Sequence, residues 1–318
     1  MSDIISLNDQ YKMKSGRSDT SNEVRENVFT DCKDAIVIKN LRKSYKDFTL
    51  NNISFNVPRG TIMGFVGENG AGKTTTIKAI LDLIRIDGGE ISILGSNARM
   101  LSNEMKAQIG VVFDGSNLHD NMNSKNINYV MKNIYPNWEE QIFNRYIKKL
   151  QLPEKKIIKE YSRGMKMKLS IAIALSHHSK LLILDEATSG LDPMVREEIL
   201  DIFLEFIQNE ENTILLSSHI ISDIEKIADY VTFIHQGNII FSESKDDLIY
   251  RHGVLHCRRE DVAVIDSNFI VGIRENSFGA EVLIRNKDDF KRRYHQFNVE
   301  KTSIEEIMLL VSRGKERF

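Results

Sequence analysis

Hydrophobic and polar positions follow two different periods along this chain, one typical of strands and the other of helices. Residues 180–187 and 213–219 contain continuous apolar runs, the pattern of strands that are covered on both faces. Between them, residues 193–208 have helical spacing and begin with proline, which is favoured in the first turn of a helix. A strand, a helix and a second strand in this order predict a parallel α/β sheet.

The first half of the chain adds short β-rich segments that are separated by turn residues. Residues 72–84 change to helical spacing and predict a helix among these strands. From about residue 115 to 178 the pattern is helical without a strand signal, which predicts an all-helical insertion. Residues 230–244 are typical of a hairpin. The predicted strands of the first half are residues 35–40, 51–57, 61–67, 88–95 and 109–113.

The two ends of the chain differ from this α/β pattern. Residues 1–34 are rich in Ser, Asn, Asp, Glu and Lys, and we expect a flexible leader. Residues 280–286 alternate like an exposed strand, and Ser303 with Glu306 forms a capping box for a last helix. The expected parts are a leader (1–34), an α/β domain (35–249) with its helical subdomain (about 115–178), and a C-terminal α+β accessory region (250–318).

Composition narrows the class of protein. The 318 residues are 41% hydrophobic, enough for a normal core, and 43 Lys and Arg against 45 Asp and Glu give a formal charge of −2. We therefore expect no broad attraction to nucleic acid or anionic lipid. Two cysteines, Cys32 and Cys257, predict neither a disulfide framework nor a metal cluster and favour a reducing compartment. Without a signal peptide or a membrane-spanning apolar run, the expected location is cytosolic.

A glycine-rich loop carries the strongest chemical signal. It lies between an apolar strand and a helix and reads G-x-x-x-x-G-K-T. Its backbone N–H groups and the lysine suit phosphate oxygens, and the Thr74 hydroxyl suits Mg²⁺, so the loop predicts binding of a nucleoside triphosphate. The candidate residues are Gly67, Glu68, Asn69, Gly70, Ala71, Gly72, Lys73, Thr74 and Thr75.

Two adjacent acids end the apolar run at residues 181–186. Asp185 suits Mg²⁺, directly or through water, and Glu186 suits orienting or deprotonating an attacking water. The alternative is an acidic pair that caps a helix after a strand. With the phosphate loop upstream, the pair predicts nucleotide hydrolysis.

Five motifs in a fixed order point to one family. The phosphate loop, YSRGM (161–165), LLILDE (181–186), SGLD (189–192) and SSH (217–219) together resemble the ATP-binding subunit of an ABC transporter over roughly residues 36–245. The resemblance implies an α/β P-loop ATPase with an antiparallel β subdomain, a helical insertion and a small C-terminal extension. It also implies ATP and Mg²⁺ as cofactors.

The resemblance implies further roles at matching positions. The signature segment, usually L-S-G-G-Q, would place Ser162, Arg163, Gly164 and Met165 over ATP bound by a second subunit, with an ordinary helix cap formed by Ser162 and Gly164 as the alternative. Tyr45 would stack on adenine, with a surface tyrosine in a turn as the alternative. His219 would contact the γ-phosphate and the attacking water, with a strand-end histidine as the alternative. Asp192 would belong to the D-loop that links the two sites, and it also suits capping the helix before Pro193.

Three positions depart from the family pattern. Asp114 stands where a glutamine usually touches Mg²⁺ and links to the membrane subunit, and its shorter carboxylate would reach the metal only through water. Arg163 replaces a glycine and Met165 replaces the signature glutamine. Arg163, Lys166 and Lys168 would either add positive potential towards the facing triphosphate or form a solvated basic face.

The resemblance implies an ATPase that pairs head to tail with an identical or different subunit and drives a separate permease from the inner face of the cell membrane. Chains of this plan resemble ABC-2 type exporters of peptides, lipids or drugs. No nucleic acid and no direct insertion into lipid are expected. One alternative is a soluble ABC-type ATPase acting on ribosomes or DNA, although such proteins resemble tandem duplications or carry coiled-coil insertions. Another is a P-loop kinase, which should lack YSRGM and SGLD.

Overall fold

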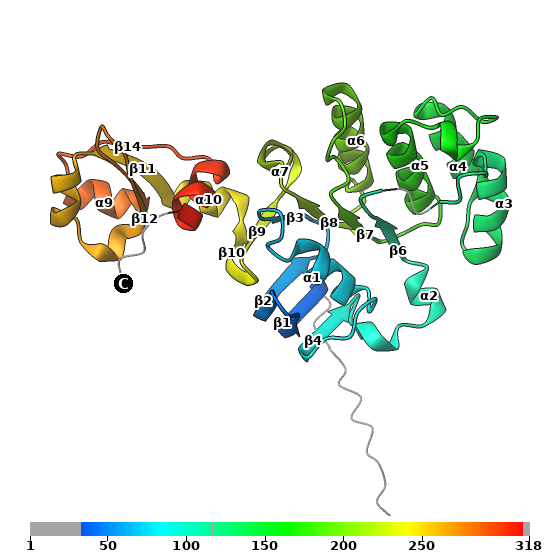
Figure 1. The fold of residues 1–318 in the computed structure, drawn as a ribbon, viewed down its shortest axis with the longest axis horizontal. Coiled ribbons are helices and arrows are strands. Elements are labelled where there is room, and N and C mark those ends of the chain that lie inside the picture. The colour runs from blue at the N-terminus through cyan, green and yellow to red at the C-terminus, as the bar shows by residue number, and fades with distance from the viewer. Residues whose placement is uncertain (1–32, 116–117, 314–318) are drawn as a thin grey trace, which may run out of the picture.

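The computed structural model describes residues 33–115 and 118–313. These residues form three β-sheets with helices packed around them. In Figure 1 the central sheet lies in the middle of the molecule, the helical segment at one end and the C-terminal sheet at the other. The predicted leader, residues 1–34, lies outside the described residues apart from its last two.

The central sheet has six strands in the order β10-β9-β3-β8-β7-β6. Neighbouring strands from β9 to β6 run parallel, and β10 pairs antiparallel with β9. The predicted order of strand, helix and parallel strand is confirmed by β7, helix α6 (Pro193–Phe206) and β8. The strands are β3 (Ile62–Val66), β6 (Ile109–Val112), β7 (Leu181–Asp185), β8 (Thr213–Ser218), β9 (Tyr230–His235) and β10 (Asn238–Ser244).

Both faces of this sheet are covered, which explains the continuous apolar runs in its strands. On β7, Leu182 and Leu184 pack in one core with helices α5 (Arg163–Leu175), α6 and α7 (Ile221–Ile227). The alternate residues Leu181 and Ile183 pack in a second core with helix α1 (Lys73–Ile80) and the antiparallel sheet. A strand with apolar residues at every position therefore contributes to two cores at once.

The antiparallel sheet has the order β2-β1-β4-β5 and covers one of these cores. Helix α1 is shorter than the predicted helix at 72–84, because Leu81 caps it and Asp82 turns the chain with φ of 52°. The elements of this region are β1 (Asp34–Ser44), β2 (Thr49–Pro58), β4 (Gly88–Ile93), β5 (Ser96–Asn97), the 3₁₀ turn η1 (Ala98–Met100) and α2 (Asn103–Lys106).

Residues 118–178 are helical, and no strand occurs among the residues described in this stretch. The helices are α3 (Ser124–Ile134), α4 (Glu140–Lys149), η2 (Ile158–Glu160) and α5. Asn123 and Asn126 form a reciprocal capping box at the start of α3. The amphipathic faces of α3 and α4 bury Ile127, Phe143 and Ile147 in the same core as α5.

The C-terminal region begins after the predicted hairpin, which β9 and β10 confirm. Its sheet has the order β12-β13-β11-β14, and helix α8 (Lys245–Arg251) connects it to β10. The expectation of an exposed strand at 280–286 is wrong: β13 is an inner strand of this sheet, and its residues Val282, Leu283 and Ile284 are fully buried. The other elements are β11 (His252–Cys257), η3 (Arg259–Val264), η4 (Ser267–Phe269), β12 (Ile270–Glu275), β13 (Ala280–Arg285), α9 (Lys287–Arg293), β14 (Val299–Glu300) and α10 (Ile304–Arg313).

The last helix, α10, ties this region to the central sheet. Its predicted capping box is confirmed, because the Glu306 N–H donates to the Ser303 hydroxyl at 3.2 Å and the Ser303 N–H donates to the Glu306 carboxylate at 2.9 Å. Ile304 and Ile307 are buried in the core that contains α7, and the Ile304 N–H donates to Glu225 Oε1 at 2.8 Å. None of the described helices combines the length and apolar character that crossing a bilayer requires.

Candidate functional site

The candidate site lies at the carboxyl ends of three adjacent parallel strands, β3, β8 and β7. The phosphate loop follows β3, Asp185 ends β7, and His219 follows β8. Ligand sites of parallel α/β sheets form at this edge, because the loops after neighbouring strands meet there. Motifs that are far apart in the sequence are thereby brought together.

The phosphate loop has a backbone that requires glycine at its last position before the helix. Gly72 caps helix α1 with φ of 117°, in the region that side chains avoid. A Cβ at Gly72 would lie 2.7 Å from Leu50 Cδ2 and 2.9 Å from Phe48 Cζ. The loop is therefore pressed against the turn between β1 and β2. Glu68, Asn69 and Gly70, at its tip, are exposed.

Lys73 is buried, and its amine is directed back over the loop. Its Nζ donates to the carbonyl oxygens of Gly67 at 2.7 Å and Glu68 at 3.3 Å. The same nitrogen lies 3.2 Å from Glu186 Oε1. The lysine charge is therefore held in the loop by oxygen atoms, which is the environment that a phosphate group would also offer.

Asp185 is buried and accepts hydrogen bonds from two hydroxyl groups. Thr74 Oγ1 donates to Oδ2 at 2.9 Å, and Ser217 Oγ donates to Oδ1 at 2.7 Å. The structure thus brings together Thr74 and Asp185, two of the three predicted metal ligands, as adjacent oxygen donors of the kind that Mg²⁺ prefers. Ser217 belongs to the SSH motif, and the sequence alone predicts no role for it. Its contact with Asp185 follows from the parallel pairing of β7 with β8, which places the two residues opposite each other.

Glu186 occupies the centre of the site. Its Oε2 lies 2.6 Å from His219 Nδ1, while Oε1 faces Lys73. Its backbone has φ of 55°, and its N–H donates to the Ser217 carbonyl at 3.1 Å. A non-glycine residue in this region is strained, and the strain persists only where surrounding contacts fix the backbone. The two predicted catalytic residues, Glu186 and His219, are therefore in direct contact.

Tyr45 lies in the turn between β1 and β2 and is 49% exposed. Its N–H donates to the Phe48 carbonyl at 2.7 Å, and Phe48 packs beside Gly72. The Lys43 amine lies 5.2 Å from the centre of the Tyr45 ring. The tyrosine is therefore close to the phosphate loop with much of its surface free, as a stacking contact with a base requires.

The signature segment begins helix α5. Ser162 caps the helix, and its hydroxyl accepts from the Met165 N–H at 3.2 Å. Gly164 lies near α6, because a Cβ there would be 3.4 Å from Val195 Cγ1. Within the described residues, no hydrogen bond or ion pair joins residues 162–165 to the phosphate loop of the same chain. Capping therefore accounts for the Ser162 side chain locally, and the residue is exposed.

The three basic residues of this segment all have acidic partners in the same chain. Arg163 pairs with Asp114 at 2.7 Å, Lys166 with Asp120 at 3.5 Å, and Lys168 with Glu198 at 2.6 Å. Each positive charge is therefore largely balanced by an acidic side chain of the same chain. This pairing argues against the alternative in which the three residues add positive potential towards a facing triphosphate. Asp114, a predicted metal ligand, faces Arg163.

Asp192 lies at the start of α6, before Pro193. Its carboxylate accepts from the Val195 N–H at 3.1 Å, so the expected capping of this helix is confirmed. Pro193 occupies the first turn, where no backbone donor is needed. The predicted D-loop role of Asp192 requires a second subunit.

The arrangement combines three chemical functions within one loop cluster. A lysine and backbone amides suit phosphate, and two oxygen donors suit a hard cation. A carboxylate in contact with a histidine suits proton transfer from water. No group of three or more His, Cys, Asp or Glu side chains that could hold a metal ion occurs among the described residues.

Comparisons with known proteins agree with this site. A family model described as ABC transporter matches residues 50–189. The lantibiotic transport ATP-binding protein SrtF of Streptococcus pyogenes is 37% identical over 212 residues, 66% of this chain and 90% of that protein. The bacitracin transport ATP-binding protein BcrA of Enterococcus faecalis is 30% identical over 246 residues, 76% of this chain and 79% of that protein.

Solved structures show the same fold. A structure described as the ATP binding subunit of an ABC transporter is 26% identical, with a TM-score of 0.59 over 68% of this chain and 92% of that chain. The ATP-binding cassette MJ0796, solved as a dimer in a post-hydrolysis state with ADP and Pi, has a TM-score of 0.59 over 66% of this chain and 98% of that chain at 21% identity, which supports the fold alone. The chain therefore belongs to the ATP-binding, ATP-hydrolysing subunits of ABC transporters.

Proposed function

We propose that two such subunits close head to tail around two ATP molecules and thereby drive a separate membrane permease from the inner face of the cell membrane. The cargo would be exported and would be a peptide, a lipid or a drug. The relatives named for transport of a lantibiotic and of bacitracin support this range of cargo. The partner ATPase would be a second copy of this chain or a related subunit.

One observation carries the proposal. Lys73, Asp185, Glu186 and His219 form a compact cluster, whereas the start of α5 has no bond to the phosphate loop of its own chain in the described structure. The N-terminus of α5 carries a positive partial charge that favours an anion. A second subunit placed head to tail would supply this helix start to the open side of the phosphate loop.

Mg²⁺ fits the oxygen donors at the site. Thr74 and Asp185 would hold it, because their side-chain oxygens are already adjacent and Asp185 is buried beside the phosphate loop. Held there, Mg²⁺ would offset the negative charge of the ATP phosphates. Asp114 would reach it only by leaving Arg163.

Different residues of this chain act in different steps of ATP hydrolysis. When a triphosphate enters the loop, the Lys73 amine exchanges its contact with Glu186 for phosphate oxygens. The released Glu186 oxygen accepts a proton from the attacking water, and His219 fixes the carboxylate from its other side. Tyr45 stacks on the base, and Ser162 and Gly164 of the second subunit meet the γ-phosphate.

The substitution Glu186→Gln tests this assignment. The amide keeps the size of the side chain but accepts protons poorly, so ATP hydrolysis should fall by at least about 100-fold, within the range for loss of a general base. ATP should still bind, and the hydrolysis-deficient subunits should accumulate as closed dimers. Hydrolysis is measured as phosphate release, and dimers by analytical ultracentrifugation.

Glu197→Gln is the matched control. Glu197 lies on the exposed side of α6 and pairs with Lys226, away from the cluster, so phosphate release should be unchanged. Hydrolysis within a fewfold of the parent in Glu186→Gln would contradict the catalytic assignment.

The permease is tested separately by affinity capture of a tagged chain from detergent extracts. Capture of ribosomes without a membrane protein would contradict the transport assignment.

A further inference from the structure

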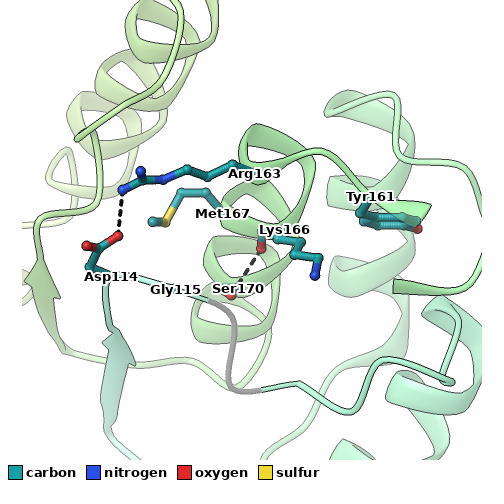
Figure 2. A pocket seen from close by; sticks show the side chains of 7 residues that line it. All are labelled: Asp114, Gly115, Tyr161, Arg163, Lys166, Met167 and Ser170. Atoms are coloured by element: carbon teal, nitrogen blue, oxygen red, sulfur yellow. Dashed lines mark hydrogen bonds and ion pairs between the residues drawn. The ribbon is translucent and has the colours of Figure 1, made fainter. Parts of the chain in front are cut away.

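The ion pair between Asp114 and Arg163 joins the end of a core strand to the start of a helix. Asp114 follows β6, and Arg163 is the first residue of α5, 49 positions later. Arg163 Nη2 donates to Asp114 Oδ1 at 2.7 Å, and each side chain is about half exposed. Figure 2 shows the Arg163 side chain extending from the start of α5 to Asp114. The pair is therefore a direct link between the helical segment and the central sheet.

The same guanidinium contacts a third segment. Gly190, in the turn between β7 and α6, has φ of 66°. A Cβ at Gly190 would lie 2.6 Å from Arg163 Nη1 and 2.9 Å from Cζ. The Arg163 guanidinium therefore lies against the backbone of this turn. One side chain connects the segments that follow β6 and β7 with the start of α5.

The contacts of Arg163 lie directly beside Ser162. Ser162 caps α5 and precedes Arg163, so the residue that pairs with Asp114 is the first residue of the helix that Ser162 caps. The opposite side of the first turn of this helix is held by the close approach of Gly164 to Val195. Asp114 and Gly190 both follow strands of the central sheet, which also carries Asp185 and Glu186. The position of Ser162 relative to the catalytic acids therefore depends on what Arg163 contacts.

We propose that Asp114 and Arg163 act as a pair of positioning residues that set the start of α5 for the second subunit. The inference rests on the proposed head-to-tail dimer and adds a named pair to it. Asp114 acts here on Arg163 and not on a metal ion. Half-exposed ion pairs add little to folding stability, so the effect of the pair lies in the geometry presented to the partner.

The surroundings of the pair allow the acidic and the basic residue to be swapped between positions 114 and 163. Both residues line a cavity of about 430 Å³ together with Tyr161, Lys166 and Met167. The space leaves room for an arginine at position 114 and an aspartate at position 163. An acid at the first position of a helix is also compatible with the helix dipole. The exchanged pair can therefore form without rebuilding the fold.

The experiment uses the Glu186→Gln chain, in which dimers persist with ATP, and measures the dimer dissociation constant by sedimentation. Asp114→Asn and Arg163→Gln should each weaken the dimer by about tenfold, as expected for directly coupled residues. The exchange variant Asp114→Arg with Arg163→Asp should return the constant to within about threefold of the parent, because it restores the pair. Urea unfolding of the single variants should stay close to that of the parent.

Lys149→Gln is the control for the loss of any ion pair. Lys149 on α4 pairs with Glu205 on α6, and both side chains are about as exposed as those of Asp114 and Arg163. This pair also links the helical segment to the rest of the chain, but it lies away from the start of α5. The dimer constant of Lys149→Gln should equal that of the parent.

Several outcomes would overturn the pairing. One is a dimer of the exchange variant that dissociates as readily as that of the worse single variant. Another is a weaker dimer in Arg163→Gln but not in Asp114→Asn, which would mean that Arg163 acts on the partner alone. A higher Mg²⁺ requirement for ATPase activity in Asp114→Asn but not in Arg163→Gln would assign Asp114 to the metal. Failure of the Glu186→Gln parent to dimerise with ATP would contradict the proposed function and this inference together, whereas a dimerising parent with unaffected pair variants would contradict the pair alone.

Discussion

The Asp185 carboxylate is fixed in the site by hydrogen bonds from neighbouring hydroxyl groups. Its carboxylate is 3% exposed and is held between the hydroxyl groups of Thr74 and Ser217. A buried carboxylate needs such donors, because an unpaired charge away from water is costly. Thr74 therefore donates to Asp185 in this structure, and in the function proposed here its oxygen would also be a ligand for Mg²⁺ when ATP is bound.

Thr74→Val is expected to lower ATPase activity strongly, because it replaces the hydroxyl by a methyl group of similar size. Hydrogen bonds to charged groups contribute about 1.5–3 kcal/mol, which corresponds to about 10-fold to 150-fold in rate if the contact serves the reaction. Thr74→Ser keeps the hydroxyl and should retain most of the activity. Steady-state phosphate release at saturating ATP compares the two, and equal rates for Val and Ser would contradict the assignment.

The sequence predicts much of the site at this scale and misses its internal contacts. Spacing alone identifies Lys73, Thr74, Asp185 and Glu186, because the motif and the strand that precedes each acid are local features. The contact of Lys73 with Glu186 depends on how distant strands pair, which no local pattern records. The partner of Arg163 is hidden for the same reason: Asp114 is 49 positions away.

Three elements of the ATPase core meet at a buried histidine. His177 follows α5 and is 1% exposed, and its ring stacks on Tyr135 at the end of α3 with centres 4.1 Å apart. The Nδ1–H donates to the Ala107 carbonyl, ahead of β6, at 2.9 Å. Burial lowers the pKa of His177 from its usual 6.5. The neutral ring therefore joins the helical segment to the central sheet.

Acid should weaken the fold through this residue. Because the pKa of His177 is lowered in the folded chain, the unfolded chain takes up the proton first as the pH falls below about 6.5, and the free energy of unfolding decreases. The contribution of one group has a slope of at most about 1.4 kcal/mol per pH unit. Urea unfolding at about pH 7.5 and about pH 5.5 measures the loss.

His177→Phe should reduce this pH dependence, because phenylalanine keeps an aromatic ring against Tyr135 but cannot take up a proton. The variant should be less stable than the parent at neutral pH, since the Ala107 carbonyl loses its donor. His256→Phe, at an exposed position on β11, is the control and should leave the pH dependence as in the parent. An unchanged pH slope in His177→Phe would show that other groups cause the acid sensitivity.

Among the helices and strands, the buried strands were predicted well from their continuous apolar runs. A strand that is covered on both faces is apolar at every position, so its sequence shows an uninterrupted apolar run. The misjudged strand, β13, has a polar residue at Glu281 and an exposed Arg285 at its end, which resemble an exposed edge. Its inner position depends on pairing with β11 and β12. The early end of α1 likewise depends on the turn at Asp82 and not on helix propensity.

At the scale of the whole molecule, the C-terminal region is joined to the ATPase core by helix α10. The C-terminal sheet has a core of its own around Phe290, but Ile304 and Ile307 are buried with α7 in the core that also contains the central sheet. In Figure 1, α10 lies between the C-terminal sheet and the rest of the molecule. We therefore expect the two regions to unfold together.

Ile307→Ala should destabilise the ATPase core as well as the C-terminal region. Truncation of a buried isoleucine costs about 2–5 kcal/mol, and Ile307 is 1% exposed. Glu305→Ala, on the exposed side of the same helix, should change stability little. Differential scanning calorimetry of Ile307→Ala, with and without ATP, should show a single unfolding transition. This transition should lie at a lower temperature than that of the parent under the same conditions. Two separate transitions, of which only the ATP-independent one moves, would contradict the coupling.

The central claim is that a finished ATPase site needs residues of two subunits. The most direct measurement is the ATPase rate per molecule as a function of protein concentration, with light scattering on the same samples. The rate per molecule should rise with concentration in step with the fraction of dimers and level off when dimers predominate. A rate per molecule that stays constant in samples that remain monomeric with ATP would contradict the claim.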